Sequence, residues 1–176
     1  EDEFTVTGYT DAQMRNDAVD FRMHFVFRFD CRILTDRCYI TNTDGSMKKG
    51  FETDSTACGI NLALEGSDVN VRIASSYISK SQAMLNLERE TMYPDFESAR
   101  KDAETSWENK LTLLTVKTDS EDLKKTFYSC LARVFMYPHK SYEINGSGEE
   151  VHYCPHNGKV GKGKYYTNNG FWDTYR

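Results

Sequence analysis

Several features that identify common protein classes are absent from this sequence. No apolar run approaches the roughly 20 residues that a membrane span needs. The chain begins with Glu1-Asp2-Glu3, the reverse of a basic signal-peptide start, so we expect a start trimmed of a targeting segment or one inside a longer chain. Its 22 basic and 27 acidic residues are mixed and give a net charge of -5. This balance argues against nucleic acid or an anionic membrane as a partner.

The sequence also lacks a C-x-x-C pair, the usual spacing of zinc-binding cysteines. Its five cysteines are Cys31, Cys38, Cys58, Cys130 and Cys154. An odd number leaves one thiol unpaired even in an oxidising compartment. A bridge between Cys31 and Cys38 across a hairpin is one arrangement, but the spacing alone does not determine the disulfide state.

What is present is material for a core, since 39% of the residues are apolar and 13% are aromatic. The segment "FRMHFVFRFD" alternates with the period of a half-buried antiparallel strand. One face carries four phenylalanines and a methionine, and we expect this face to lie in a core. Its members are Phe21, Met23, Phe25, Phe27 and Phe29.

Further strands are predicted in "CRILTDRCYI", "ACGINLALEG" and "NVRIASSYIS", at the spacing typical of a β-sandwich. Four strands are too few to close a sandwich, so either the sheet is small or its other half lies upstream of Glu1. Between them, "NTDGSMKKGFE" resembles a calcium loop through Asn42, Asp44 and Gly45. Both key carboxylates of such a loop are missing, which favours a hairpin turn.

After Ser79 the period becomes helical. A first helix is predicted around Met84 and Leu87, and a second begins at Asp95, a plausible N-cap, with apolar residues three and four apart. Asp119 or Ser120 is expected to cap a third helix, whose stripe consists of Leu123, Phe127, Leu131 and Phe135. Beyond Pro138 no period survives, which indicates long loops.

Two motifs in these loops suggest ligands but fit them poorly. "GKVGKGKY" satisfies G-x-x-x-x-G-K, but Tyr165 replaces the Ser or Thr that would hold magnesium and no helix follows, so a solvated turn is favoured over a nucleotide site. In "HYCPH", His152, Cys154 and His156 would lie on one side of an extended chain. No fourth zinc ligand is near in sequence, which favours loop histidines bound to backbone and water.

The last residues, "GFWDTYR", suit one task. A sugar offers apolar ring faces that stack on aromatic side chains and hydroxyls that hydrogen-bond to carboxylate or guanidinium groups. Trp172, Asp173 and Arg176 supply these groups together. The alternative is a buried tryptophan beside an Asp–Arg pair that fixes a loop.

Three stretches, "TFYSCLARVFMYPHKSYEINGSGEEVHY", "GKV" and "YYTNNGFWDTYR", resemble in order and spacing the calcium-dependent exo-α-mannosidases of glycoside hydrolase family ninety-two. The upstream "VRIASSYISKSQAMLNLERE" and "DFESARKDAETSWENKL" resemble that family's end of sandwich and linker helices. The resemblance implies an α+β fragment of a two-domain protein. Residues 1–79 would be the later part of an N-terminal antiparallel β-sandwich, 80–118 the linker helices, and 119–176 the start of an (α/α)6 catalytic barrel.

The resemblance further implies a secreted protein, or one resident in a secretory or lysosomal-type compartment, that removes terminal α-linked mannose, with α-1,2 linkages favoured, from high-mannose glycans. The mechanism would be inverting and calcium-dependent, with the acid, the base and most calcium ligands outside this chain. No catalytic residue or metal ligand is therefore assigned, and this fragment alone is expected to be inactive. Its partner would be the remainder of its own polypeptide.

The same resemblance matches Asp173 to the aspartate that hydrogen-bonds the terminal mannose. Trp172 would shape that pocket and Arg176 would orient the carboxylate. A rival hypothesis is a non-catalytic carbohydrate-binding or adhesion protein that retains a β-sandwich and an aromatic sugar platform. The linkage, the oligomeric state and the origin of the fragment stay open.

Overall fold

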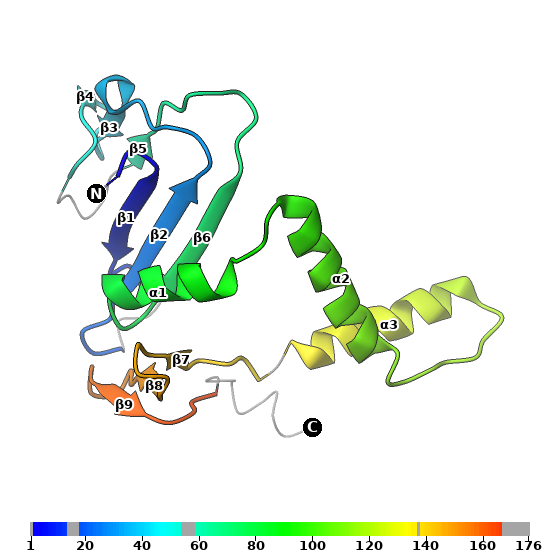
Figure 1. Ribbon diagram of the computed structural model, residues 1–176. Helices are drawn as coiled ribbons and strands as arrows, with labels where there is room; N and C mark the ends of the chain where they lie inside the picture. Colours follow the sequence, from blue (N-terminus) through cyan, green and yellow to red (C-terminus); the bar gives the residue numbers. More distant parts are fainter. Residues whose placement is uncertain (1, 14–17, 54–58, 137, 167–176) are drawn as a thin grey trace.

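The computed structural model describes residues 2–13, 18–53, 59–136 and 138–166. Within them, the chain forms three separate three-stranded antiparallel sheets and three α-helices (Figure 1). The fold class is therefore the mixed α+β arrangement expected from the sequence. No helix among these residues is long and apolar enough to cross a membrane.

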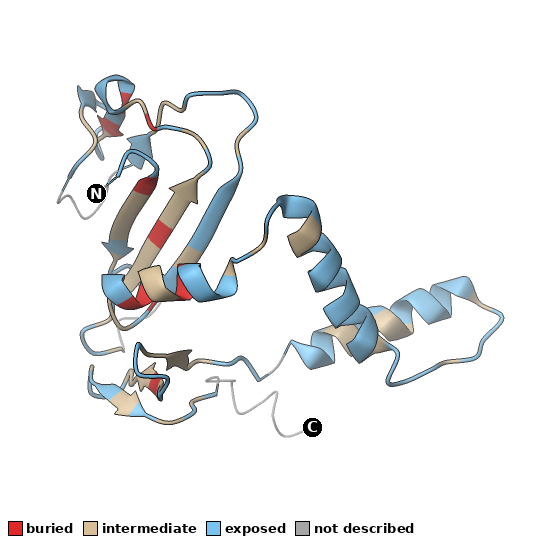
Figure 2. Cartoon of the chain, viewed as in Figure 1, coloured by how far each residue is buried: buried red, intermediate tan, exposed pale blue. Residues whose placement is uncertain are grey.

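The central sheet consists of β1 (Thr5–Thr10), β2 (Met23–Phe29) and β6 (Val71–Ser76), in the order β1-β2-β6. Helix α1 (Lys80–Glu90) follows β6 directly and lies across one face of this sheet (Figure 1). The core forms between them, where Val26 of β2 is fully buried against Ala83 and Leu87 of α1. Figure 2 shows how few other residues of the chain are buried.

The prediction that the phenylalanine face of β2 lies in the core is wrong for the described chain. Val26, on the opposite face, is the buried residue, whereas Phe25 and Phe27 are only half-buried. The Phe25 and Phe27 rings pack on each other with centroids 5.3 Å apart, and the Phe25 ring lies over Gly8 of the paired strand. Their neighbours Val71 and Ile73 on β6 are exposed. Alternation was correctly read, but it does not reveal which face a helix will cover.

The second sheet is small. It pairs β3 (Tyr39–Thr41) with β4 (Met47–Lys49) and β5 (Gly59–Asn61), in the order β4-β3-β5, after a short 3₁₀ helix at Thr35–Arg37. A turn with Gly45 at φ 81° joins β3 to β4, as the hairpin interpretation predicted.

The cysteines that the structure describes are unpaired. Cys31, Cys38, Cys130 and Cys154 are free thiols, so no bridge joins Cys31 to Cys38. Cys38 is buried, and its sulfur contacts the Leu34 carbonyl at 3.4 Å. Cys58 lies outside the described residues.

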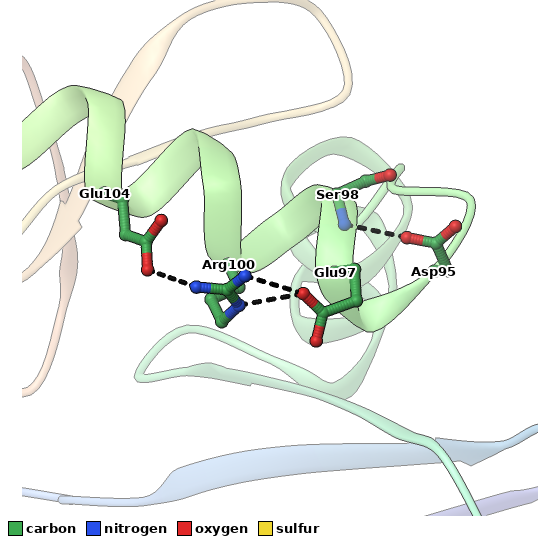
Figure 3. Close-up of polar contacts among 5 residues, drawn as sticks. All are labelled: Asp95, Glu97, Ser98, Arg100 and Glu104. Carbon is green, nitrogen blue, oxygen red and sulfur yellow. Dashed lines mark hydrogen bonds and ion pairs between the residues drawn. The ribbon is translucent and has the colours of Figure 1, made fainter.

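The helices α2 (Phe96–Leu111) and α3 (Glu121–Phe135) form a pair beside the sheets (Figure 1). Their predicted caps are confirmed: the Asp95 carboxylate accepts the Ser98 N–H at 2.7 Å, and Ser120 caps α3. Within α2, Arg100 bonds to both Glu97 and Glu104 (Figure 3). Neither helix has a fully buried residue. Local interactions therefore carry much of their stability within this chain.

The third sheet lies where the sequence analysis expected only loops. It pairs β7 (Glu143–Ile144) with β8 (Glu150–Tyr153), and β8 with β9 (Val160–Lys162). These strands have only two to four residues, too few to establish a period of two against the surrounding glycines and lysines. The sheet lies below α1 in the view of Figure 1.

We predict that Leu87→Ala lowers the free energy of unfolding by about 2–4 kcal/mol, because it opens a cavity in the core between α1 and the central sheet. Urea unfolding measures this change. Leu113→Ala is the matched control, because Leu113 is 71% exposed and the same truncation there should cost less than about 0.5 kcal/mol. Equal losses in the two variants would contradict the assigned core.

We also predict that Asp95→Ala lowers the melting temperature at pH 7. The hydrogen bond from the Ser98 backbone holds the pKa of Asp95 below its ordinary value. Its contribution is therefore complete above the pKa of the unfolded carboxyl, and it is lost as the pH falls through the lower folded-state pKa.

Thermal unfolding between pH 7 and pH 2.5 measures this effect, and the Asp95→Ala and unmodified chains should converge at the acidic end. Asp68→Ala, at an exposed carboxylate, is the control and should match the unmodified chain throughout. A deficit for Asp95→Ala that persists undiminished in acid would contradict the capping role.

Candidate functional site

The predicted sugar-binding residues Trp172, Asp173 and Arg176 lie outside the described residues. The described chain reaches Tyr166, five residues before the "FWDTYR" segment, here called the terminal motif. The structure therefore shows how the approach to this motif is held.

The approach is fixed to the segment that precedes β7. Lys140 and Tyr166 form an isolated antiparallel bridge, and the Ser141 N–H donates to the Tyr165 carbonyl at 2.9 Å. The rings of Tyr142 and Tyr166 meet edge to face with centroids 5.7 Å apart. The Lys140 ammonium lies 4.6 Å from the centroid of the Tyr142 ring. Backbone pairing and ring contacts thus hold the described chain at Tyr165 and Tyr166.

His152 of β8 packs against Tyr165, in the same segment. Its ring stacks on Tyr165 with centroids 5.0 Å apart, and its Nδ1 lies 2.9 Å from the Gly163 carbonyl. A side chain at Gly161 would come within 2.7 Å of this ring, so the close approach requires glycine there. His152 is thus engaged with backbone and a neighbouring ring, as its non-zinc interpretation predicted.

The described residues do not form a metal site. Across the described ranges 2–13, 18–53, 59–136 and 138–166, no group of three or more His, Cys, Asp or Glu side chains is arranged to hold a metal ion. The described part of the chain therefore lacks a cluster of three acidic side chains of the kind that calcium prefers. The "GKVGKGK" segment likewise forms β9 and its turn, with Lys164 paired to Glu150 at 3.5 Å, in place of a strand-to-helix phosphate loop.

Glu143 of β7 joins the third sheet to the central sheet and α1. One carboxylate oxygen accepts the Tyr77 backbone N–H at 3.2 Å, and the other accepts the Asn86 side-chain amide at 2.7 Å. Asn86 is buried in α1, and its amide also donates to the Ser75 carbonyl at 3.0 Å. A single carboxylate is thus hydrogen-bonded to the end of β6 and to the helix that covers it.

Two more side chains of α1 hydrogen-bond to Ile144 of β7 and to Asn145, the residue after it. Gln82, also buried, donates to the Ile144 carbonyl at 2.8 Å and to the Asn86 side-chain oxygen at 2.9 Å. Arg89 donates to the carbonyls of Ile144 and Asn145. We call the set of Gln82, Asn86, Arg89 and Glu143 the junction network. The junction network was not predicted from the sequence, because polar residues on a helix usually face solvent.

The part of the chain that matches a known protein family begins at Gln82, a member of the junction network. Residues 82–176 match the family model described as the glycosyl hydrolase family 92 catalytic domain. The matched region includes most of α1 and all of the third sheet, and it extends through the terminal motif.

Solved structures match almost the entire chain. The first is a family GH92 inverting mannosidase from Bacteroides thetaiotaomicron, with a TM-score of 0.84 and 28% identity over 99% of this chain and 24% of that one. The second, a family GH92 alpha-mannosidase from the same organism, has a TM-score of 0.74 at 21% identity, again over 99% and 24%, and shows the fold alone.

A curated relative from Arthroderma benhamiae is described as an uncharacterized secreted glycosidase. It is 32% identical over 115 residues, which cover 57% of this chain and 15% of the relative. The chain therefore spans about one quarter or less of the length of each of these three proteins.

We predict that Glu143→Gln lowers the free energy of unfolding by about 1–3 kcal/mol. Glutamine has one acceptor oxygen where Glu143 uses two, so its NH₂ group would face a donor, either the Tyr77 N–H or the Asn86 amide. Urea unfolding measures the loss. Glu88→Gln on the exposed face of α1 is the matched control and should stay within about 0.5 kcal/mol. A Glu143→Gln chain as stable as this control would show that the junction network is dispensable.

Proposed function

The chain belongs to glycosyl hydrolase family 92, and from this premise we propose that the protein of which it is a part removes terminal α-linked mannose from high-mannose glycans. The observation that supports this proposal most is the agreement of nearly the whole chain with a GH92 inverting mannosidase. We further propose that the favoured linkage is α-1,2. The domain boundaries at 79–80 and 118–119 stay a prediction.

The proposed reaction is an inverting hydrolysis. One carboxylic acid protonates the leaving glycosidic oxygen while a second carboxylate removes a proton from the water that attacks the opposite face of the sugar. The bond from the anomeric carbon to the leaving oxygen breaks as the bond to water forms. We place both carboxylates in polypeptide outside this chain, so that the chain alone is inactive.

This chain's proposed part is to bind the sugar. The Asp173 carboxylate would accept hydrogen bonds from hydroxyls of the terminal mannose, Trp172 would pack beside it, and Arg176 would orient the carboxylate. The bridge between Lys140 and Tyr166 and the stack of His152 on Tyr165 support this role, because they fix the chain just before the motif. Calcium is proposed as a cofactor bound mostly by other parts of the polypeptide.

We propose the remainder of the same polypeptide as this chain's protein partner. The half-buried face of the central sheet carries Phe25 and Phe27 with exposed Val71 and Ile73 beside them. An apolar face of this kind is usually covered by further protein. The proposed location is outside the cell or within a secretory or lysosomal-type compartment, in keeping with the description of the Arthroderma benhamiae relative as secreted.

The test is mannose release from α-1,2-linked mannobiose by the full-length protein, with calcium and with a chelator. We predict release of the β-anomer first, observed by proton NMR, and loss of release on chelation that calcium restores. Asp173→Ala should lower kcat/KM by about 10- to 100-fold, the loss expected for a hydrogen bond to a charged group. Asp68→Ala, at an exposed carboxylate, is the matched control and should keep full activity.

The outcomes separate the enzyme from its rival. No release from any α-mannobiose by full-length, calcium-loaded protein would overturn the enzyme proposal. If such protein still bound mannose and lost that binding in Asp173→Ala, the carbohydrate-binding or adhesion protein would be the better account.

A further inference from the structure

A cavity of about 650 Å³ lies where the central sheet meets the third sheet. We call it the junction cavity. Its walls come from the segment before β2, from the residues after β6, and from the β8–β9 hairpin. Among its lining residues are Asp20, Phe21, Arg22, His24, Tyr77 and Tyr153. Residues from the family-matched part of the chain and from the part before it therefore share one cavity.

The walls of the junction cavity are held together by short contacts. The Tyr153 hydroxyl donates to the Val19 carbonyl at 2.6 Å, and the Val19 N–H donates to the Pro155 carbonyl at 2.9 Å. Gly158, at φ 69°, approaches so closely that a side chain there would lie 3.0 Å from the Val19 carbonyl oxygen. Asp20 itself has φ 51°, in the left-handed region that aspartate and asparagine adopt more readily than most residues. These contacts thus join the segment before β2 to the β8–β9 hairpin at the edge of the cavity.

One wall is aromatic. The rings of Phe21, Tyr77 and Tyr153 are mutual neighbours, with centroids 5.6 to 6.3 Å apart. Tyr77 remains 45% exposed, so part of its ring surface is free to contact a ligand. Burial raises the pKa of Tyr153, which keeps its hydroxyl protonated as the donor to Val19.

The other wall is polar and of mixed charge. Carboxylates of Asp11 and Asp20 line it together with the Arg22 guanidinium, which lies 4.9 Å from the centroid of the Tyr9 ring. Burial, aided by the Arg22 charge, lowers the pKa of His24, so the imidazole is neutral at pH 7. Two carboxylates and one guanidinium give this wall a formal charge of -1. This lining suits a neutral ligand with many hydroxyls better than a phosphate or a polycation.

We propose that the junction cavity binds a neutral hexose unit of the glycan substrate, with the sugar ring on Tyr77 and its hydroxyls bonded to Asp20 and Arg22. The proposal rests on the proposed function for the identity of the glycan. It adds a subsite whose named residues differ from Trp172, Asp173 and Arg176. Its volume lies within the 300–1,000 Å³ typical of ligand sites, which is ample for one or two hexoses.

The test compares kcat/KM of the full-length protein for a branched high-mannose oligosaccharide and for α-1,2-mannobiose. Tyr77→Ala should lower kcat/KM for the oligosaccharide by about 10-fold and leave the value for mannobiose within twofold. Tyr77→Phe keeps the ring and should behave as the unmodified protein. Tyr39→Ala removes an exposed ring on β3 and is the matched control.

Asp20→Asn supplies a second test, because asparagine also tolerates the left-handed conformation. It should lower kcat/KM for the oligosaccharide alone, by about 5-fold or more. Unchanged ratios in both variants, or equal falls for both substrates, would overturn the cavity proposal while leaving mannose release intact.

If the full-length protein hydrolyses neither substrate, the proposed function fails but the cavity is still testable. Calorimetric titration with the oligosaccharide then measures binding directly. Weaker binding by Tyr77→Ala than by Tyr39→Ala would support the subsite, and equal binding would overturn it.

Discussion

The arrangement of this chain depends on one polar contact at a partly buried site, the Glu143 carboxylate between the Tyr77 N–H and the Asn86 amide. Removing such groups from water is costly unless every partner is satisfied, and here both oxygens and the amide are. The contact therefore specifies one geometry between the central sheet and the third sheet. Apolar packing alone would specify it less strictly, because only Val151 of the third sheet is a buried hydrophobic residue among the described residues.

The junction cavity and the segment that ends at Tyr166 both depend on that geometry. Glu143 lies in β7, three residues after Lys140, which forms the isolated bridge to Tyr166. The β8–β9 hairpin of the third sheet supplies Tyr153 and Gly158 to the junction cavity. Moving the sheet relative to α1 would displace Tyr153 and Gly158, and with them one wall of the cavity. This dependence gives a reason for the hydrogen bonds from Gln82 and Arg89 of α1 to the Ile144 carbonyl of β7. On the surface of a helix, such side chains would otherwise bond to water.

Features set by residues close in sequence could be predicted, whereas features set by contacts between distant segments could not. The caps at Asp95 and Ser120 and the turn at Gly45 are set by residues a few positions apart, and each was predicted. Which face of β2 is buried depends on α1, some 60 residues later, and the alternation in "FRMHFVFRF" is apolar enough to fit either face. The contact of Tyr153 with Val19 spans 134 residues and has no sequence signal. The terminal motif was recognised by chemistry and resemblance, and its placement lies outside the described residues.

The distribution of burial indicates what this part of the protein is built to do. A cluster of buried hydrophobic residues lies between α1 and the central sheet, while α2 and α3 have no buried residue and Phe25 and Phe27 are half-buried. A chain that spans 24% of a matched mannosidase exposes surfaces that an autonomous domain would bury. The specific polar contacts lie instead where the third sheet meets the central sheet and α1. There, hydrogen bonds of 2.6 to 3.2 Å join segments far apart in sequence. The chain thus positions segments relative to one another.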